Sequence, residues 1–363
     1  MKLTIIAGAR PNFIKIAPLI HTIQKMQKEG MILSYRLVHT GQHFDRKMSE
    51  TFFEELNIPQ PDINLGCGGG SQAEQTAAIM VAFEKELTGH PADLVLVVGD
   101  VTSTMACSIV AKKQQTKVAH VEAGIRSFDL SMPEEINRMV TDSIADYFFT
   151  TTLWASDNLR KTGIPDDRIF FVGNVMIDTL LANMGRFKKP ECYDALGLQE
   201  KEYIVLTMHR PNNVDDLSKL KQSLQEIVSN VKGLPVIFPI HPRTAKVFKE
   251  LDLNTDNLHI IEPLGYLEFN YLVKHSKAVI TDSGGITEET TVMGVPCLTL
   301  RDNTERPETC AIGTNELVGT NPQHIKPALQ KLFSGEWKKG SIPQLWDGKT
   351  AERIVNILIQ LNV

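Results

Sequence analysis

The sequence Leu94-Val95-Leu96-Val97-Val98-Gly99-Asp100 decides the fold class. A run of bulky apolar residues with no polar alternation is typical of a strand that is buried on both faces. The glycine and the carboxylate that follow mark the place where this strand ends and the chain turns. A strand of this kind predicts a parallel sheet with helices packed on both sides.

The same pattern recurs along the chain on both sides of this segment. We expect further strands at 3–7, 35–39, 118–121, 147–150 and 169–172 in the first half, and at 203–208, 236–239, 259–261, 278–281 and 297–300 in the second half. Helical periodicity fills the gaps, and Ser71-Gln72-Ala73-Glu74 is a capping box that predicts a helix ending near Leu87. The fold class is therefore α/β, with two Rossmann-like, doubly wound domains.

The domain boundary is expected where this periodicity is interrupted. Gly185, Lys188-Lys189-Pro190 and Gly197 lie in such a stretch. We expect an N-terminal domain at 1–183, a C-terminal domain at 184–345 and a last segment at 346–363 with a helix at 350–363. Two domains also agree with the length, because 363 residues exceed what one hydrophobic core usually supports.

Composition excludes several classes of partner. A net charge of -5 gives no general attraction to nucleic acid, and no segment approaches the apolar length that a membrane span needs. The five cysteines lack C-x-x-C spacing, which argues against disulfides or a zinc site and favours a reducing compartment. We therefore expect a cytoplasmic protein without a metal, a nucleic-acid partner or a membrane partner.

Polar residues follow the predicted strands of the first half, where open parallel sheets bind their ligands. Arg10 and Lys15 open a helix after the first strand, so they form a plausible anion site, although they could also be surface cations. Asp100 and Glu122 end two buried strands, and Glu134-Glu135 opens a helix. We expect these carboxylates to converge, while the last pair could simply be first-turn acids that the helix dipole favours.

The second half carries basic and glycine-rich strand ends. The predicted strands run into His209-Arg210, into His241-Pro242-Arg243 and into Asp282-Ser283-Gly284-Gly285. The glycines at a helix start predict a cradle of backbone N–H groups for a diphosphate, and Glu288 or Glu289 could meet a ribose diol. A histidine such as His241 is more often structural, and no second histidine lies at metal-ligand spacing.

These motifs together resemble the non-hydrolysing UDP-N-acetylglucosamine 2-epimerases from residue 3 to about residue 320. They are Gly8-Ala9-Arg10-Pro11 through Lys15, Thr40-Gly41-Gln42-His43, Gly99-Asp100, His120-Val121-Glu122-Ala123-Gly124-Ile125-Arg126, Pro133-Glu134-Glu135 with Asn137-Arg138, Asp282-Ser283-Gly284-Gly285 with Glu288-Glu289, and Thr304-Glu305-Arg306-Pro307-Glu308. The resemblance implies the glycosyltransferase-B fold, with the active site in the cleft between two facing domains, a C-terminal helix packed back on the N-terminal domain, and a homodimer.

The resemblance also implies roles for individual residues. The catalytic set is Asp100, Glu122, Glu134 and His209; the UDP-binding set is Arg10, Lys15, Arg138, Phe269, Ser283, Gly284, Gly285, Glu289 and Arg301; and a possible regulatory site contains Gln42, His43 and His241. The chain departs from the family's usual pattern at Ala9, Asn12-Phe13 and Pro211-Asn212. The last departure puts local sugar or phosphate contacts in question, and not the fold.

The chemistry can be argued without the family. The C2 hydrogen of a UDP-linked 2-acetamido sugar is not next to a ring carbonyl, so inversion needs transient oxidation or elimination of UDP. The sequence lacks the glycine fingerprint that a bound NAD usually requires, so we expect no cofactor. Elimination needs an acid or base on each sugar face and cations on the departing diphosphate, and both are available here.

Three alternatives share much of this pattern. An epimerase for a UDP-2,3-diacetamido-uronic acid would need one more cation for the C6 carboxylate. A glycosyltransferase of the same fold would transfer the sugar to an acceptor. A UDP-sugar sensor would keep the cradle but could dispense with Asp100, Glu122 and Glu134.

Overall fold

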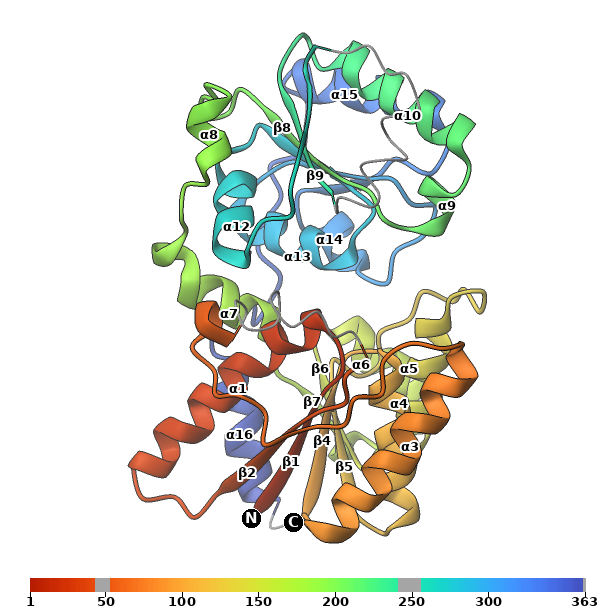
Figure 1. Ribbon diagram of the computed structural model, residues 1–363, viewed down its shortest axis with the longest axis vertical. Coiled ribbons are helices and arrows are strands. Elements are labelled where there is room, and N and C mark those ends of the chain that lie inside the picture. Colours follow the sequence, from red (N-terminus) through yellow and green to blue (C-terminus); the bar gives the residue numbers. More distant parts are fainter. Residues whose placement is uncertain (43–52, 241–255, 362–363) are drawn as a thin grey trace. The chain divides into compact units, whose positions relative to one another are not determined.

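The computed structural model describes residues 1–42, 53–240 and 256–361. The chain forms two compact units: unit 1 comprises Met1–Ala182 and Gln344–Val363, and unit 2 comprises Asn183–Pro343. Each unit is built around one parallel sheet with helices on its faces (Figure 1). The α/β class expected from the sequence is therefore confirmed.

Unit 1 contains a seven-stranded parallel sheet in the order β3-β2-β1-β4-β5-β6-β7. Its strands are β1 (Lys2–Ala7), β2 (Ser34–His39), β3 (Ile63–Asn64), β4 (Leu94–Val98), β5 (Lys117–Val121), β6 (Tyr147–Thr150) and β7 (Ile169–Phe171). The predicted strands agree with these to within a residue at their ends. The sequence did not predict β3, because two residues are too few to show any alternation.

The helices of unit 1 cover both faces of its sheet. They are α1 (Arg10–Lys28), α3 (Gln72–Gly89), α4 (Thr102–Lys113), α5 (Pro133–Ile144), α6 (Leu153–Lys161), α7 (Val175–Asn183) and α16 (Thr350–Gln360). Helices α1 and α16 contact each other on one face, while α3, α4 and α5 lie on the other (Figure 1). The predicted capping box begins α3. Ser71 Oγ accepts a hydrogen bond from the Glu74 N–H, and Glu74 Oε2 accepts one from the Ser71 N–H.

The C-terminal helix α16 is fastened within unit 1. Asp178 in the first turn of α7 accepts a hydrogen bond of 2.7 Å from the Ala351 N–H, and the buried Trp346 donates from Nε1 to the Thr151 carbonyl at 3.2 Å. The helix ends at Gln360, whereas the sequence suggested that it continues to the terminus. The last two residues lie outside the described part of the chain.

Unit 2 contains a six-stranded parallel sheet in the order β10-β9-β8-β11-β12-β13. Its strands are β8 (Ile204–Thr207), β9 (Val236–Pro239), β10 (Leu258–Ile261), β11 (Ala278–Thr281), β12 (Cys297–Thr299) and β13 (Asn315–Leu317). Its helices are α8 (Glu191–Ala195), α9 (Pro211–Val214), α10 (Leu217–Asn230), α12 (Tyr266–His275), α13 (Gly284–Met293), α14 (Pro307–Ala311) and α15 (Ile325–Phe333). The sequence missed β13 because Asn-Glu-Leu is not an apolar run.

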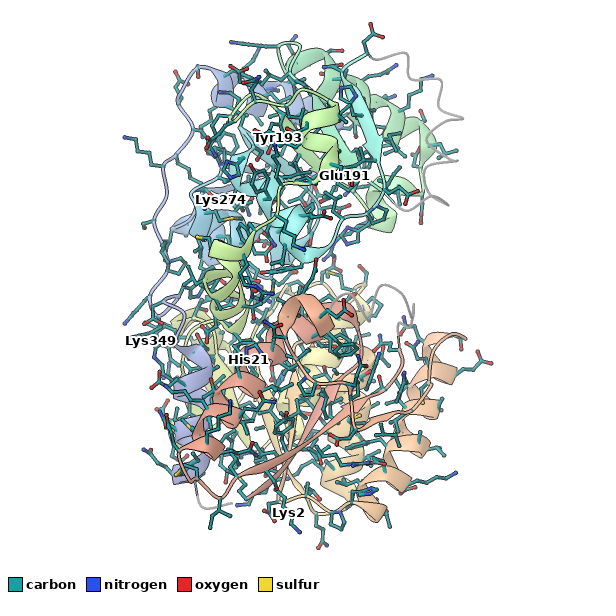
Figure 2. All side chains as sticks on the ribbon, turned by 60° about the vertical axis from the view of Figure 1, so that its left-hand side comes forward. Lys2, His21, Glu191, Tyr193, Lys274 and Lys349 are labelled. Atoms are coloured by element: carbon teal, nitrogen blue, oxygen red, sulfur yellow. The ribbon has the colours of Figure 1, made fainter. Side chains whose placement is uncertain are left out.

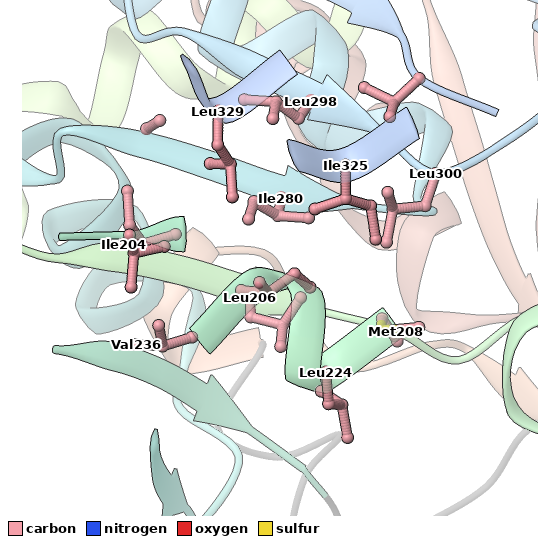
Figure 3. Close-up of a cluster of buried hydrophobic side chains, with 14 of the residues drawn as sticks. Ile204, Leu206, Met208, Leu224, Val236, Ile280, Leu298, Leu300, Ile325 and Leu329 are labelled. Carbon is pink, nitrogen blue, oxygen red and sulfur yellow. The ribbon is translucent and has the colours of Figure 1, made fainter. Parts of the chain in front are cut away.

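Alternation along β8 explains why helices cover both faces of this sheet. Ile204 and Leu206 pack into a core with α10 and α15, which Figure 3 shows through Leu224 and Leu329. Tyr203 and Val205 face the opposite core, which includes residues of α12. Tyr193 of α8, labelled in Figure 2, packs edge to face on Tyr203 with ring centroids 5.9 Å apart.

The strand order reverses at one point in each sheet. In unit 1, β1 pairs with both β2 and β4; in unit 2, β8 pairs with both β9 and β11. Ligands of open parallel sheets bind at the carboxyl ends of the strands next to such a switch point. The residues after β1, β4, β8 and β11 are therefore the ones that the fold places for binding.

Candidate active site

The turn between β1 and α1 in unit 1 is organised by Asn12. Its Oδ1 accepts from the N–H groups of Gly8 and Ala9 at 3.0 Å each, and its Nδ2 donates to the Val98 carbonyl at 3.0 Å. The buried amide thereby connects the end of β1 to the end of β4. Sequence analysis recorded Asn12 only as a departure from the family pattern, although an amide in the first turn of a helix is a known capping signal.

Lys15 and Glu122 form a buried ion pair at the carboxyl edge of this sheet. Lys15 Nζ lies 2.5 Å from Glu122 Oε2, and both side chains are almost wholly inaccessible to solvent. Glu122 has a φ of 69°, a left-handed conformation that is uncommon for a residue with a side chain. A Cβ on Gly99 would lie 3.0 Å from Lys15 Nζ, so the end of β4 borders the same pair.

Asp100 is positioned by residues of α5. Asn137 Nδ2 donates to the Asp100 carbonyl at 2.8 Å, and Arg138 Nη1 lies 3.4 Å from Asp100 Oδ2. The Arg138 guanidinium is buried, and its Nε lies 3.2 Å from Glu135 Oε2. Asp100 keeps part of its carboxylate exposed, so it is a reactive group held against a buried cation.

The two neighbouring glutamates at the start of α5 have different environments. Glu135 is buried, and its carboxylate accepts from the N–H groups of Ser127 (2.9 Å) and Phe128 (3.2 Å). Glu134 is exposed, and within residues 1–42, 53–240 and 256–361 its carboxylate makes no hydrogen bond or ion pair. Of these two acids, Glu134 is therefore the one available for chemistry.

The residues of the possible regulatory site are described only in part. Gln42 Oε1 accepts from the Ser103 N–H at 3.2 Å and from Ser103 Oγ at 2.8 Å, at the start of α4. His43 and His241 lie outside the described residues, and the side chain of Arg10, the first residue of α1, is not described either.

In unit 2, a buried carboxylate orients His209. Asp282, which follows β11, accepts from the N–H groups of His209 and Arg210 and lies 2.8 Å from His209 Nδ1. Burial alone would raise the pKa of Asp282, but His209 and these N–H groups lower it to about 2. The His209 side chain is 64% exposed, so the ring is held at Nδ1 and presents Nε2 away from Asp282.

The altered segment after His209 has a structural role. Asn213 is buried, and its Nδ2 donates to Asp282 Oδ2 at 3.1 Å and to the Leu300 carbonyl at 3.0 Å. It therefore joins the ends of β11 and β12 and supports the carboxylate that orients His209.

The predicted anion cradle lies at the start of α13. Ser283 precedes the helix, and its side chain does not cap the first turn, so the backbone N–H groups of Gly284 and Gly285 stay directed outward. A Cβ on Gly284 would lie only 2.5 Å from Glu305 Oε1. Glycine is thus required here by the close approach of Glu305.

Three arginines surround this glutamate. Arg301 Nη2 lies 2.6 Å and Arg210 Nη2 3.8 Å from the Glu305 carboxylate, while Arg306 pairs with Glu288 at 2.7 Å. Burial would raise the pKa of Glu305, but the arginines lower it to about 2. The cradle is therefore bordered by cations whose charge is partly balanced from within the unit.

Glu289 and Phe269 lie on the adjoining helices α13 and α12. Glu289 is buried and accepts a hydrogen bond of 2.9 Å from the Tyr266 hydroxyl. Burial raises the pKa of Glu289 to about 7. Phe269 is half-buried and packs against the core that contains Tyr203. A polar acceptor and an aromatic face are thus available on this side of the cradle.

The two strand edges offer complementary chemistry. Unit 1 supplies carboxylates for proton transfer with Lys15 and Arg138 behind them, and unit 2 supplies donors for an anion. In the described part of the chain, no group of three histidine, cysteine or acidic side chains could hold a metal ion. No described helix is long and apolar enough to cross a membrane.

Comparisons with known proteins agree with this arrangement. Residues 24–359 match the family model described as UDP-N-acetylglucosamine 2-epimerase. The UDP-N-acetylglucosamine 2-epimerase of Methanocaldococcus jannaschii is 42% identical over 99% of both chains. A UDP-2,3-diacetamido-2,3-dideoxy-D-glucuronate 2-epimerase of Pseudomonas aeruginosa is 42% identical over 88% of both chains.

The fold of a solved relative agrees closely as well. The crystal structure of the Methanocaldococcus jannaschii UDP-GlcNAc 2-epimerase in complex with UDP-GlcNAc and UDP superposes with a TM-score of 0.89 at 42% identity, covering 99% of this chain and 100% of that one. The glycosyltransferase-B fold expected from the sequence is thereby confirmed. The chain belongs to the UDP-N-acetylglucosamine 2-epimerase family.

Proposed function

We propose that this protein interconverts UDP-N-acetylglucosamine and UDP-N-acetylmannosamine by inverting C2 of the sugar. The observation that carries the proposal is the set of carboxylates at the edge of the unit 1 sheet, two of them next to buried cations. A protein that only binds UDP-sugars does not need such a set. Membership of the family and the full-length similarity to enzymes of this name support the same activity.

The reaction proceeds by elimination and re-addition. A base removes the C2 proton, the C2–H electron pair forms the C1–C2 double bond, and the C1–O bond breaks with its electrons leaving on UDP. An acid then delivers a proton to the opposite face of C2, and the UDP oxygen adds again to C1. The reaction consumes no oxidant, so it needs neither NAD nor a metal.

The unit 1 carboxylates serve as the proton carriers in this scheme. Glu122 forms a buried ion pair with Lys15 at 2.5 Å, whereas Glu134 is exposed. Asp100 lies beside the Arg138 guanidinium, which can also contact a phosphate oxygen. Different environments let carboxylates of one site act as acid and as base.

The unit 2 groups hold and stabilise the departing diphosphate. The N–H groups of Gly284 and Gly285, with Ser283, face the phosphates, and His209 and Arg301 supply positive charge; Arg10 contributes from the start of α1. Glu289 accepts from the ribose hydroxyls and Phe269 packs on the uracil.

The test is incubation of purified protein with UDP-N-acetylglucosamine in deuterated water without added cofactor. We expect UDP-N-acetylmannosamine to form with deuterium at C2, because the proton removed is not the one returned. Product without deuterium at C2 would exclude the elimination mechanism. No product, together with transfer of the sugar to an added acceptor, would identify a glycosyltransferase instead.

A second substrate is favoured by one comparison. The relative from Pseudomonas aeruginosa, which is 42% identical, is named for a UDP-2,3-diacetamido-uronic acid. Parallel measurement of kcat/KM for the two UDP-sugars decides between them. A higher value for the uronic acid would move the assignment to that substrate class and would leave the elimination chemistry unchanged.

We further propose that the protein works as a homodimer in the cytoplasm. Phe128 and Leu130 before α5, and Ile136 and Met139 on α5, are exposed apolar side chains of unit 1. A second copy that covered them would remove this apolar surface from water. Light scattering of the wild type and of Ile136→Glu tests this: we expect a dimer that the charged side chain weakens, and a monomeric wild type would refute it.

A further inference from the structure

A fully buried histidine lies beneath the ends of β4 and β5. His120 Nε2 lies 2.8 Å from the Gly99 carbonyl oxygen, and Nδ1 lies 2.7 Å from Asp142 Oδ1. The imidazole is completely inaccessible to solvent, and Asp142 is buried with it. No step of the proposed reaction uses this pair.

The partners of the ring fix its protonation. The Gly99 carbonyl can only accept, so Nε2 carries a hydrogen. Asp142 Oδ2 accepts from the Gly124 N–H at 3.1 Å and from Arg126 Nη1 at 2.6 Å. Burial acting alone would raise the pKa of Asp142, but His120 and Arg126 outweigh it and lower that pKa. Asp142 is a carboxylate because its Oδ2 pairs with Arg126 at 2.6 Å, and Nδ1 of His120, 2.7 Å from its Oδ1, therefore carries a second hydrogen.

The network reaches the backbone or the helix behind each proposed proton carrier. Gly99 immediately precedes Asp100, and His120 lies two residues before Glu122 on β5. Asp142 lies on α5, the helix that starts with Glu134. Asp142 is also one helical turn beyond Arg138, whose guanidinium faces Asp100.

We propose that His120 is a positioning residue that holds Asp100, Glu122 and Glu134 in their relative positions. Asp142 and the Gly99 carbonyl keep its ring as an imidazolium. A neutral ring would direct a lone pair at one of its two acceptors and release that contact. The charged groups around it are Asp142 from α5 and Arg126 from the loop after β5, with Glu122 and Lys15 at the same sheet edge. The kinetic part of this inference rests on the proposed function, whereas the charge state of His120 does not.

The charge state is tested on the wild-type protein by nitrogen-15 NMR with labelled histidine. The His120 signals are identified by their loss in His120→Gln. We expect both ring nitrogens to carry a hydrogen at about pH 8, because each lies within hydrogen-bond distance of an acceptor. A neutral tautomer of His120 at that pH would overturn the proposal.

The positioning role is tested by kinetics. His120→Gln and Asp142→Asn should each lower kcat by about 10²-fold, because a small displacement of reacting groups has an effect of that size. KM for the UDP-sugar and the Kd for UDP should stay within about twofold, since no UDP group is touched. Entry of deuterium at C2 should slow in proportion to kcat.

Asp146→Asn is the matched control. Asp146 accepts from the Val118 N–H at 2.8 Å and pairs with Lys112 at 2.7 Å, so it fastens the opposite end of β5 in the same way. We expect it to lose stability and keep full turnover. Equal turnover in Asp142→Asn and Asp146→Asn would refute the positioning role. A wild type that does not epimerise would instead refute the proposed function, and the NMR result would still decide the charge of His120.

Discussion

The carboxyl edges of the two sheets share a topology and have opposite arrangements of charge. In unit 1, the groups available for chemistry are acids, Asp100 and Glu134, and the cations Lys15 and Arg138 are buried behind them. In unit 2, the available groups are His209 and the N–H groups of α13, and the buried charges behind them include the acid Asp282. The switch point of the fold determines where a site forms. The buried charged side chains behind it, which we call the buried layer, determine which charge the site presents.

The comparison has a physical basis in desolvation. A buried charge is tolerated only with a partner, so the charges beneath each strand edge are paired. Lys15 pairs with Glu122 in unit 1, and Asp282 lies 2.8 Å from His209 Nδ1 in unit 2. Substitutions of the accessible groups should therefore alter catalysis or binding. Substitutions of the buried charged groups behind them should also alter the stability of the fold.

The largest expected effect comes from neutralising the unit 1 acids. Asp100→Asn, Glu122→Gln and Glu134→Gln should each lower turnover by roughly 10²–10⁴-fold, the range for a positioned acid or base. The Kd for UDP should change little, because most of the groups that we propose to hold the diphosphate lie in unit 2. Steady-state kinetics and calorimetric titration with UDP measure the two quantities, with the exposed Glu84→Gln as control. Full turnover in all three variants would contradict the proposal that unit 1 supplies the catalytic acids and unit 2 the diphosphate contacts.

Breaking the buried pair of unit 1 should have the next largest effect. Lys15→Met leaves the Glu122 carboxylate buried without its cation, which should cost about 3–5 kcal/mol of unfolding free energy. The double variant Lys15→Met with Glu122→Gln should recover much of this loss, since no charge is then left unpaired. Urea unfolding of the four proteins of the cycle measures the coupling. Additive losses would show that the two side chains do not stabilise each other.

Sequence reasoning located the strand ends but not the buried layer behind them. Local composition predicts a strand such as Leu94–Val98, and the fold then determines where the residues after it lie. The partner of a buried polar side chain is a different matter, because it is set by tertiary contact. Lys15 and Glu122 are 107 residues apart, and nothing near either one in the chain indicates the other.

Polar residues inside a core were the least predictable. Asn12 and Asn213 join the ends of neighbouring strands, and no motif in the sequence predicts either of these contacts. The sequence did not predict β13 for the same reason. The buried Asn315 of this strand accepts a hydrogen bond from the Thr299 hydroxyl across the sheet, so the strand lacks an apolar side chain at this position. Hydrophobic periodicity carries no information on such contacts.

A buried acid in unit 2 sharpens the comparison through pH. The pKa of Glu289 is raised from 4.5 to about 7 by burial, so its contribution to stability is fully present below pH 4.5 and is lost as pH rises through about 7. Glu289→Gln keeps an acceptor for Tyr266 and removes the charge. At about pH 8 the unfolding free energy of this variant should exceed that of the wild type by on the order of 2–3 kcal/mol. At about pH 5 the two proteins should have similar unfolding free energies.

Its neighbour in the chain provides the control. Glu288 is ion-paired with Arg306 at 2.7 Å, so Glu288→Gln should destabilise the protein at about pH 8, because the buried Arg306 loses this ion pair. Denaturant unfolding across this pH range gives both curves. A gain for Glu288→Gln, or a loss for Glu289→Gln at the higher pH, would contradict the assignment of which acid is paired.

A smaller effect is expected from filling the cradle of unit 2. The Cβ of Gly284→Ala would lie 2.5 Å from Glu305 Oε1, so Glu305 must move away from Arg301. The displaced carboxylate would disturb the arginines that border the cradle, so UDP affinity should fall about tenfold with a parallel rise in KM. Gly185→Ala, where a Cβ meets nothing within 4 Å, is the control and should bind UDP normally. Unchanged UDP affinity in Gly284→Ala would place the diphosphate elsewhere.

The smallest effect separates the two units as folding bodies. Ser71→Ala removes the N-cap of α3 in unit 1, and Asp216→Ala removes the N-cap of α10 in unit 2, where Asp216 Oδ1 accepts from the N–H groups of Ser218 and Lys219 at 3.0 Å. Each change should cost about 1 kcal/mol and leave turnover intact, because neither cap borders the site. Each unit has its own buried core, so native-state hydrogen exchange should accelerate only in the unit that carries the substitution. Equal acceleration in both units by either variant would mean that they open as one cooperative body, and the comparison between them would then hold for chemistry alone.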